Sequence, residues 1–260
     1  MRKIGLDEIH DILYNILCDI DDFCSANAIR WSLGYGTLLG AVRYGDFIPW
    51  DDDADIIMPR EDFDRFVATY NGKYECILNT RRRDVYYVAG VAKVHDPSTD
   101  KFRSAESRHK YISHYGVSVD IFALDPVPDD PEEYKAFMKK AIHYHRRLLY
   151  RSRKNGSPLL MLSSHMHSTD WWLQQCNDLA HSCSAEKCER IGIILGSRTL
   201  KNVHPKDFFA HIKPIALRGK PFPGPDDPAA YLTQIYGANY MTPPPENERL
   251  GHGGEVWALE

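Results

Sequence analysis

The chain has 260 residues, of which 43% are hydrophobic and 26% charged, and its formal net charge is −4. This composition is ordinary for a soluble globular protein, and the mild acidity argues against nucleic acid as a partner. The N-terminus has no signal-peptide pattern, no apolar run reaches the ~18 residues of a membrane helix, and six cysteines do not suggest a disulfide scaffold at this length. We therefore expect a cytoplasmic protein with free thiols.

Helix and strand patterns alternate in the first half of the chain. Residues 6–24 repeat apolar side chains at helical spacing with acids opposite, which predicts an amphipathic helix packed on a core. The further helices predicted in this half are 37–43 and 61–70, and the predicted strands are 30–33, 54–58, 86–94 and 116–124.

The second half of the chain carries mainly helical patterns. Helices are predicted at 131–153, as one or two segments within 168–196, and at 228–236, whereas prolines at 214, 221, 223, 225 and 228 predict an irregular stretch. We therefore expect an α/β (α+β) catalytic core at residues 1–128 and a mainly helical part at 129–260.

Two carboxylates stand at the start of the strand predicted at 54–58. Asp53 and Asp55 flank a single residue, so on a strand both side chains project to the same side. Two ionised carboxylates so close repel each other unless a cation lies between them, and such hard oxygen ligands suit Mg²⁺, or alternatively Mn²⁺. A solvated acidic turn at residues 51–53 is the alternative interpretation.

A glycine turn precedes this acidic segment by fewer than ~20 residues. Gly34 and Gly36 permit a backbone that approaches a phosphate closely, and Thr37 offers a hydroxyl at the start of the next helix. A glycine turn alone is weak evidence, but followed by a strand-borne Asp-x-Asp it favours phosphate chemistry over a plain acidic loop.

A third carboxylate, Asp120, lies within the apolar strand predicted at 116–124. An acid in such a strand is costly unless it is paired or bound to a metal, although an edge position facing water would also relieve it. Asp125 is predicted to begin the proline-containing turn that follows.

Several of these segments resemble the LicD family. The resemblance rests on the stretches GTLLGAVR (36–43), FIPWDDDADI (47–56), MPREDF (58–63) and VDIFALD (119–125), and on the tail YGANYM (236–241) with Arg249 and His252. Ala54 stands where the family usually has isoleucine. The matched segments span most of residues 31–125 and 214–252, and residues 130–210 show no diagnostic motif.

The resemblance implies a polymerase β-type nucleotidyltransferase-like mixed sheet with a mainly helical C-terminal part, whose tail returns to the active site. It implies that Asp53, Asp55 and Asp120 are the metal-binding and catalytic carboxylates, with Asp120 acting as ligand or as base. The residues expected to contact substrate are Gly36, Thr37, Arg43, Arg60, Lys93 and His252; for the three cations, a surface charge is the alternative.

The implied activity is transfer of a phospho-alcohol, phosphocholine in the first instance, from a CDP-alcohol to a hydroxyl of a glycan or lipid-linked glycan. A nucleotidyltransferase that uses a nucleoside triphosphate and an inactive binding module of the same fold are the alternatives. The quaternary ammonium of choline would need aromatic faces. The candidates are Tyr35, Trp50, Tyr86, Tyr87, Tyr115 and Phe122.

Two further clusters allow more than one interpretation. Cys176, Cys183 and Cys188 could bind zinc with His181, but thiols on helices more often pack as small apolar groups. The basic stretch at 143–154 is either a solvated helix face or a surface for an anionic acceptor or for peripheral contact with the inner face of the membrane.

Overall fold

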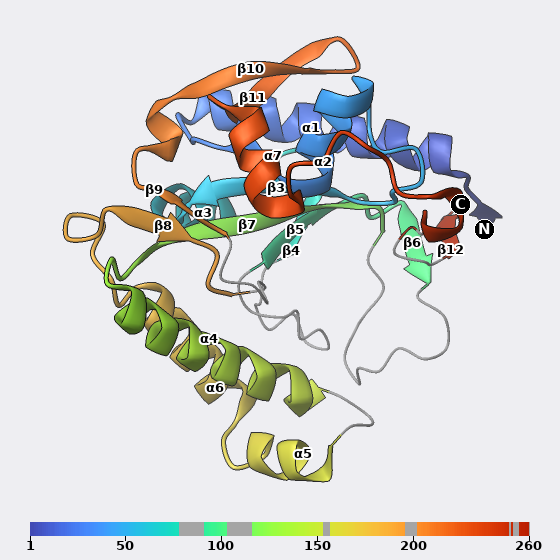
Figure 1. The fold of residues 1–260 in the computed structure, drawn as a ribbon. Helices are drawn as coiled ribbons and strands as arrows, with labels where there is room; N and C mark the ends of the chain where they lie inside the picture. The colour runs from blue at the N-terminus through green and yellow to red at the C-terminus, as the bar shows by residue number, and fades with distance from the viewer. Residues whose placement is uncertain are drawn as a thin grey trace.

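The computed structural model describes residues 1–77, 91–102, 116–152, 157–195, 202–249, 251 and 255–259 (Figure 1). Within these ranges a mixed sheet is covered by helices, and a group of three helices extends away from it. This confirms the predicted mixed α/β fold. Of the strand predicted at 86–94, only Val91 onward is described. None of the described helices combines the length and hydropathy that a membrane span requires.

The central sheet carries the acidic residues. Its main strands lie side by side in the order β2 (Ser32–Leu33), β3 (Ala54–Pro59), β7 (Ser118–Val127), β5 (Val91–His95) and β4 (Glu75–Ile77). β3 and β7 run parallel, and the other pairs are antiparallel. β8 (Arg190–Gly192) pairs with the end of β7, and β9 (Val203–Pro205) pairs with β8.

The two faces of this sheet differ in chemistry. Ile56, Ile121 and Ala92 are fully buried on one face, in a core shared with α1 (Leu6–Ala26) and α3 (Arg60–Thr69). Strand side chains alternate, so the residues next to them project to the opposite face. That face bears the polar residues of the site, next to the start of α2 (Tyr35–Tyr44) and to α7 (Pro228–Tyr236).

A second hydrophobic core holds three helices together. α4 (Pro131–Ser152), α5 (Pro158–Ser164) and α6 (Thr169–Ala180) follow β7 and project from the sheet (Figure 1). Met138, Trp172 and Cys176 are buried among them, together with Val127 at the end of β7. The helix predicted at 131–153 is thereby confirmed.

The helical prediction for 168–196 is correct only for its first part. α6 ends at Ala180, and residues 190–192 form β8. Ile191 and Gly192 pair with Pro126 and Asp125 of β7, so the exposed edge at the end of β7 recruits this isoleucine-rich segment into the sheet.

The proline-rich stretch is an antiparallel hairpin rather than an irregular segment. β10 (Ile212–Leu217) pairs with β11 (Lys220–Pro225), and prolines 221, 223 and 225 are two residues apart. Spacing of two places them all at one kind of pairing position, where no ladder N–H is required. Arg218 and Gly219 have φ values of 51° and 79°, as a type I′ turn requires.

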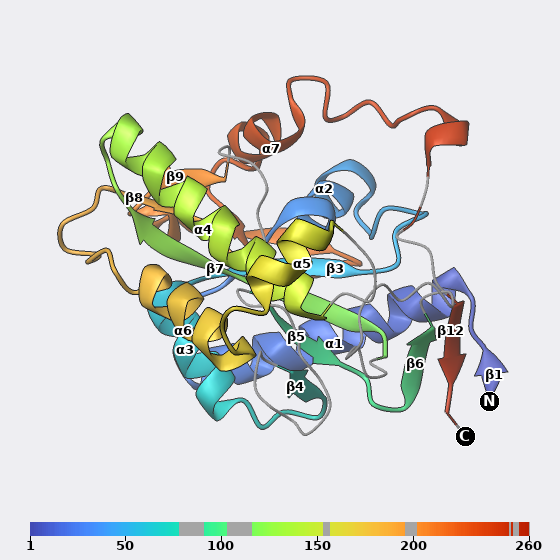
Figure 2. The same cartoon turned by 90° about the horizontal axis from the view of Figure 1, so that it is seen from below.

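Both ends of the chain meet in a small three-stranded sheet. β12 (Glu255–Ala258) pairs with β1 (Arg2–Lys3) on one side and with β6 (Thr99–Phe102) on the other (Figure 2). Two short 3₁₀ helices, η1 (Phe208–Ala210) and η2 (Glu246–Glu248), complete the described elements. The tail therefore runs from α7 past the acidic loop to the N-terminus.

Candidate functional site

Asp55, Asp120 and Lys93 form a row across three neighbouring strands. Asp55 on β3 is paired in register with Asp120 on β7, and Asp120 is paired with Lys93 on β5. Neighbouring strands lie about 4.8 Å apart, so the three side chains project from adjacent positions on one face. Lys93 Nζ donates to Asp120 Oδ1. Lys93 is only 4% exposed, so it is a buried cation and not a surface charge.

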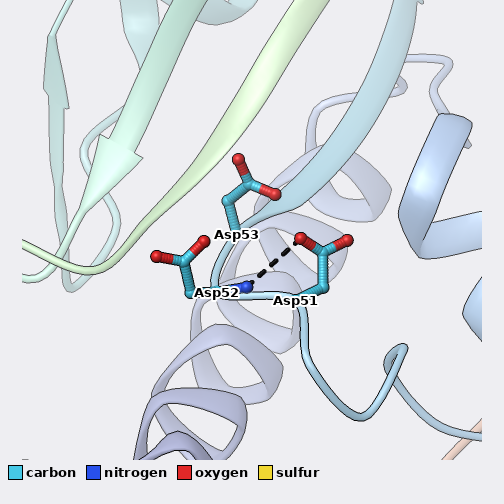
Figure 3. A group of neighbouring side chains, drawn as sticks. All are labelled: Asp51, Asp52 and Asp53. Atoms are coloured by element: carbon cyan, nitrogen blue, oxygen red, sulfur yellow. Dashed lines mark hydrogen bonds between the residues drawn. The ribbon is translucent and has the colours of Figure 1, made fainter. Parts of the chain in front are cut away.

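Asp51, Asp52 and Asp53 lie in the loop immediately before β3 (Figure 3), where one carboxylate oxygen from each comes within 4.8 Å of the others. Asp52 is buried and ion-paired with Lys101 of β6 at 3.0 Å. His10 Nε2 of α1 lies 2.8 Å from the Asp51 carbonyl oxygen. The loop is thus fixed from two sides, with Asp52 serving as an anchor.

The carboxylates act on one another through their charge. The pKa of Asp55 is raised well above its ordinary value by burial, and further by Asp53, Asp120 and Asp51, while Lys93 opposes the rise. A cation among these oxygens would relieve the repulsion. In the part of the chain that the structure describes, Asp51–Asp53 is the only group of three or more His, Cys, Asp or Glu residues close enough to share a metal ion.

The glycine turn positions β3. The N–H of Asp55 donates to Thr37 Oγ1 at 2.6 Å, and the N–H of Gly34 donates to the Asp55 carbonyl at 3.1 Å. A side chain on Gly36 would meet Asp51 Oδ2 at 2.9 Å. Gly36 therefore leaves room for the carboxylates, and Thr37 holds the backbone of Asp55.

Aromatic rings line the same face beside the acids. The ring of Tyr35, whose backbone has a φ of 42°, lies 5.2 Å from that of Phe122 and 6.4 Å from that of Tyr231. Burial raises the pKa of Tyr236, and the charge of Asp55 raises it further, so this hydroxyl also lies near the acids. Tyr86, Tyr87 and Tyr115 lie outside the described residues.

The comparisons with known proteins identify the family of the chain. The family model described as "LicD/FKTN/FKRP, nucleotidyltransferase domain" matches residues 28–161, which include all the carboxylates above. The chain belongs to the LicD family. It is 30% identical over 277 positions, covering all of both chains, to a protein of Haemophilus influenzae named "Lipopolysaccharide cholinephosphotransferase LicD". An uncharacterised protein of Rickettsia prowazekii is 44% identical over 154 positions, covering 51% of this chain and 57% of that protein.

One of the two arginines predicted to contact substrate, Arg60, is not brought to the acids. Arg60 is the first residue of α3 and follows the end of β3, whereas Asp55 lies near the start of that strand. Its Nε donates to Asp125 at 2.5 Å and its Nη1 to Asp64 at 3.0 Å, so its charge is matched there. Asp125 does not begin a turn but lies buried within β7. Arg43 lies near the end of α2, with its guanidinium 5.6 Å from the centre of the Tyr44 ring.

Arg60 instead lines a cavity of about 370 Å³ that also reaches His181, Cys183 and Cys188. Cys176 is buried in the second core and does not share a metal-ligand position with the other two cysteines. The Cys183 thiol is within hydrogen-bonding reach of Cys188. No zinc site therefore forms from these thiols among the described residues.

The C-terminal tail of this LicD-family chain lies against the acidic loop. A side chain on Gly251 would meet the Trp50 carbonyl oxygen at 2.7 Å, and the Arg249 guanidinium lies 4.9 Å from the centre of the Trp50 ring. The predicted contact His252 lies outside the described residues. Asp51, Tyr236 and Arg249 were missed as site candidates, although all three stand in the stretches that resemble the family.

Proposed function

We propose that this protein is a magnesium-dependent transferase that moves phosphocholine from CDP-choline to a hydroxyl of a glycan. The observation that carries the proposal is the closeness of Asp53, Asp55 and Asp120. Asp55 on β3 is paired in register with Asp120 on β7, and the charges of Asp53 and Asp120 both raise the pKa of Asp55. The relative that aligns over its whole length and is named for cholinephosphate transfer and lipopolysaccharide supports this group and acceptor.

The residues present fit a divalent metal. Asp53 belongs to the group of three acids close enough to share an ion, and Asp55 feels the charges of Asp53 and Asp51; Asp53 and Asp55 would hold Mg²⁺, which would relieve the repulsion that raises the pKa of Asp55. When bound, the metal would neutralise charge on the phosphoryl oxygens of the donor. Lys93 occupies Asp120 Oδ1, so Oδ2 would be the atom that binds the metal or accepts the proton of the acceptor hydroxyl.

The aromatic rings would supply the choline site. Tyr35 and Phe122 are only partly buried, and Tyr236 is 45% exposed, so their faces are open to a ligand near the acids. A quaternary ammonium gains ~0.5–2 kcal/mol from each aromatic face that it meets. Tyr231 is buried beneath them and would orient Tyr35 rather than touch the donor.

The second candidate function is nucleotidyl transfer from a nucleoside triphosphate, which the family's description as a nucleotidyltransferase domain favours. It would use the same carboxylates, so the site geometry does not separate the two. The complete set of acids speaks against an inactive binding module, because an unused group of mutually repelling buried charges only destabilises the fold.

The test is to incubate the protein with Mg²⁺ and, separately, CDP-choline, CDP-ribitol, CDP-glycerol and nucleoside triphosphates, and to identify the released product. We expect CMP from CDP-choline, and a loss of about 100-fold or more in Asp53→Asn. Asp7→Asn, an exposed acid of α1, is the matched control and should keep full activity. Pyrophosphate release from a triphosphate, with no CMP from any CDP-alcohol, would favour the second candidate.

A further inference from the structure

Charge is distributed very unevenly between the helical group and the rest of the chain. Residues 134–169 contain eight Lys and Arg residues and no Asp or Glu, in a chain whose net charge is −4. All the acids therefore lie elsewhere, and this segment forms a local positive region.

Three basic side chains of α4 lie wholly or partly at the surface. Lys139 and Arg146 are exposed and Arg147 is partly exposed. None of the three forms an ion pair with a residue that the structure describes, whereas Lys135 in the first turns of α4 is paired with Glu132 at 2.6 Å. No acid in the described part of the chain pairs with these three charges, so they are available to an anionic surface.

α5 and the turn after it expose large apolar side chains. Leu159, Leu162 and Met166 are 75%, 71% and 73% exposed, and their spacing of three and four residues follows the period of a helix. The second core is already filled by other residues of α4 and α6. Packing within the described part of the chain therefore does not explain why three large apolar side chains are exposed to water.

The basic and apolar side chains belong to one region of the surface. The His143 ring of α4 lies 6.2 Å from the Trp172 ring, and Trp172 Nε1 donates to the Ser164 carbonyl at the end of α5. The α4 segment that carries Arg146 is thus the neighbour of α5. In Figure 1, α5 lies at the lower extremity of the molecule, at the opposite end from α1 and the β10–β11 hairpin.

We propose that Leu159, Leu162, Met166, Lys139, Arg146 and Arg147, here called the α4–α5 patch, bind the surface of a bilayer that contains anionic lipid. Apolar side chains of such a helix enter the boundary between headgroups and acyl chains, while Lys and Arg meet the anionic headgroups. A second copy of this chain fits poorly, because a two-fold contact through the same patch would bring like charges together.

The proposed bilayer contact of the α4–α5 patch depends on the proposed function only for its biological role. If the acceptor is a glycan on a lipid, binding the bilayer brings the enzyme to the surface where its acceptor is held. Vesicle binding itself needs neither CDP-choline nor Mg²⁺. The two proposals can therefore fail independently.

The test is co-sedimentation of the full chain with vesicles of phosphatidylcholine alone or mixed with phosphatidylglycerol. We expect binding to the mixed vesicles that weakens as salt rises, because salt screens the attraction. Arg146→Gln/Arg147→Gln should weaken binding by about fivefold for each charge removed, and Leu159→Ser/Leu162→Ser by about tenfold. The matched controls, Lys73→Gln/Lys187→Gln and Leu259→Ser, alter exposed residues elsewhere and should bind as the wild type does.

Three results would overturn the proposal. They are absence of wild-type binding to either vesicle, unchanged binding of both patch variants, and a wild-type dimer in solution that the patch variants convert to monomer. Release of CMP from CDP-choline should be equal in all these variants. Its absence in the wild type would count against the proposed function and leave the vesicle result standing.

Discussion

Lys93 is the residue on which the charge of the candidate site depends. It is buried and bonded to Asp120, which in turn lies beside Asp55 in the register of the sheet. The cation offsets part of the repulsion among the carboxylates, as its opposing effect on the pKa of Asp55 shows. Removing it leaves anions in a poorly solvated place without a partner.

We predict that Lys93→Met lowers the free energy of unfolding by about 3 kcal/mol, because breaking a buried ion pair strands the remaining charge. Lys93→Met/Asp120→Asn should recover most of this loss, since both partners become neutral, while activity stays absent. Urea unfolding of both variants measures the effect. Equal stability of Lys93→Met and the wild type would show that the pair contributes nothing.

His204 makes a separate prediction about acid stability. It is 6% exposed and stacks on Tyr231 at 5.1 Å, and burial lowers its pKa from 6.5 to about 4. Between these values the unfolded chain binds a proton that the folded chain does not, so stability falls as pH falls from 6.5 towards 4. The total loss is about 3 kcal/mol.

His204→Phe should keep the ring stacking and remove this proton uptake, which flattens the dependence of unfolding free energy on pH in that window. His211→Phe, at a site whose side chain is 63% exposed, is the control and should leave the dependence unchanged. Chemical unfolding at a series of pH values measures both. An unaltered slope in His204→Phe would contradict the assignment.

At the scale of elements, the tail and the acidic loop depend on each other. Gly251 lies so close to the Trp50 carbonyl that a Cβ would come within 2.7 Å of it, and this atom is backbone that cannot rotate away. Arg249 rests on the Trp50 ring from the same tail. The contact is a close approach between two backbones that only glycine permits.

We predict that Gly251→Val moves the tail off the loop and lowers kcat/KM by about tenfold, because small displacements of positioning elements have effects of this order or larger. Gly5→Val is the control, since nothing lies within 4 Å of a Cβ at Gly5. Steady-state kinetics with CDP-choline measures both. Full activity of Gly251→Val would mean that the tail does not serve the site.

At the scale of the whole molecule, metal binding should change stability as well as activity. The clustered acids destabilise the metal-free protein, and a ligand that binds only the folded state stabilises it by about 2.7 kcal/mol at 100 times its Kd. We expect Mg²⁺ to raise the Tm of the wild type by several degrees, and chelation to reverse this.

Asp55→Asn should show the opposite pattern, with a Tm above that of the wild type without metal and no further rise with Mg²⁺. Asp7→Asn should respond to Mg²⁺ as the wild type does. Thermal unfolding with and without chelator measures these shifts. An Mg²⁺ response of normal size in Asp55→Asn would place the ion elsewhere.

The sequence by itself determined the elements with strong local signals and the family. α1, α2, α3, β3, β7, α4 and α7 lie where apolar periodicity and glycine turns predict them, because these signals are contained within each segment. Asp53 and Asp55 were also candidates from spacing alone, although only Asp55 lies on β3 and Asp53 ends the loop before it. Membership of the LicD family, inferred from the motifs, is confirmed by the family match and the full-length relative.

Only the tertiary structure decided which residues meet. Strand register places Asp120 and Lys93 beside Asp55, whereas Arg60 pairs with Asp125 beyond the far end of β3, although Lys93 and Arg60 were both candidate phosphate contacts. The 212–225 hairpin and β8 form because partner strands are available to them. No local sequence pattern indicates that such partners exist. Pairing between residues far apart in the sequence depends on the whole fold. The charge partners of a residue, and with them the chemistry of the site, therefore cannot be predicted from single segments.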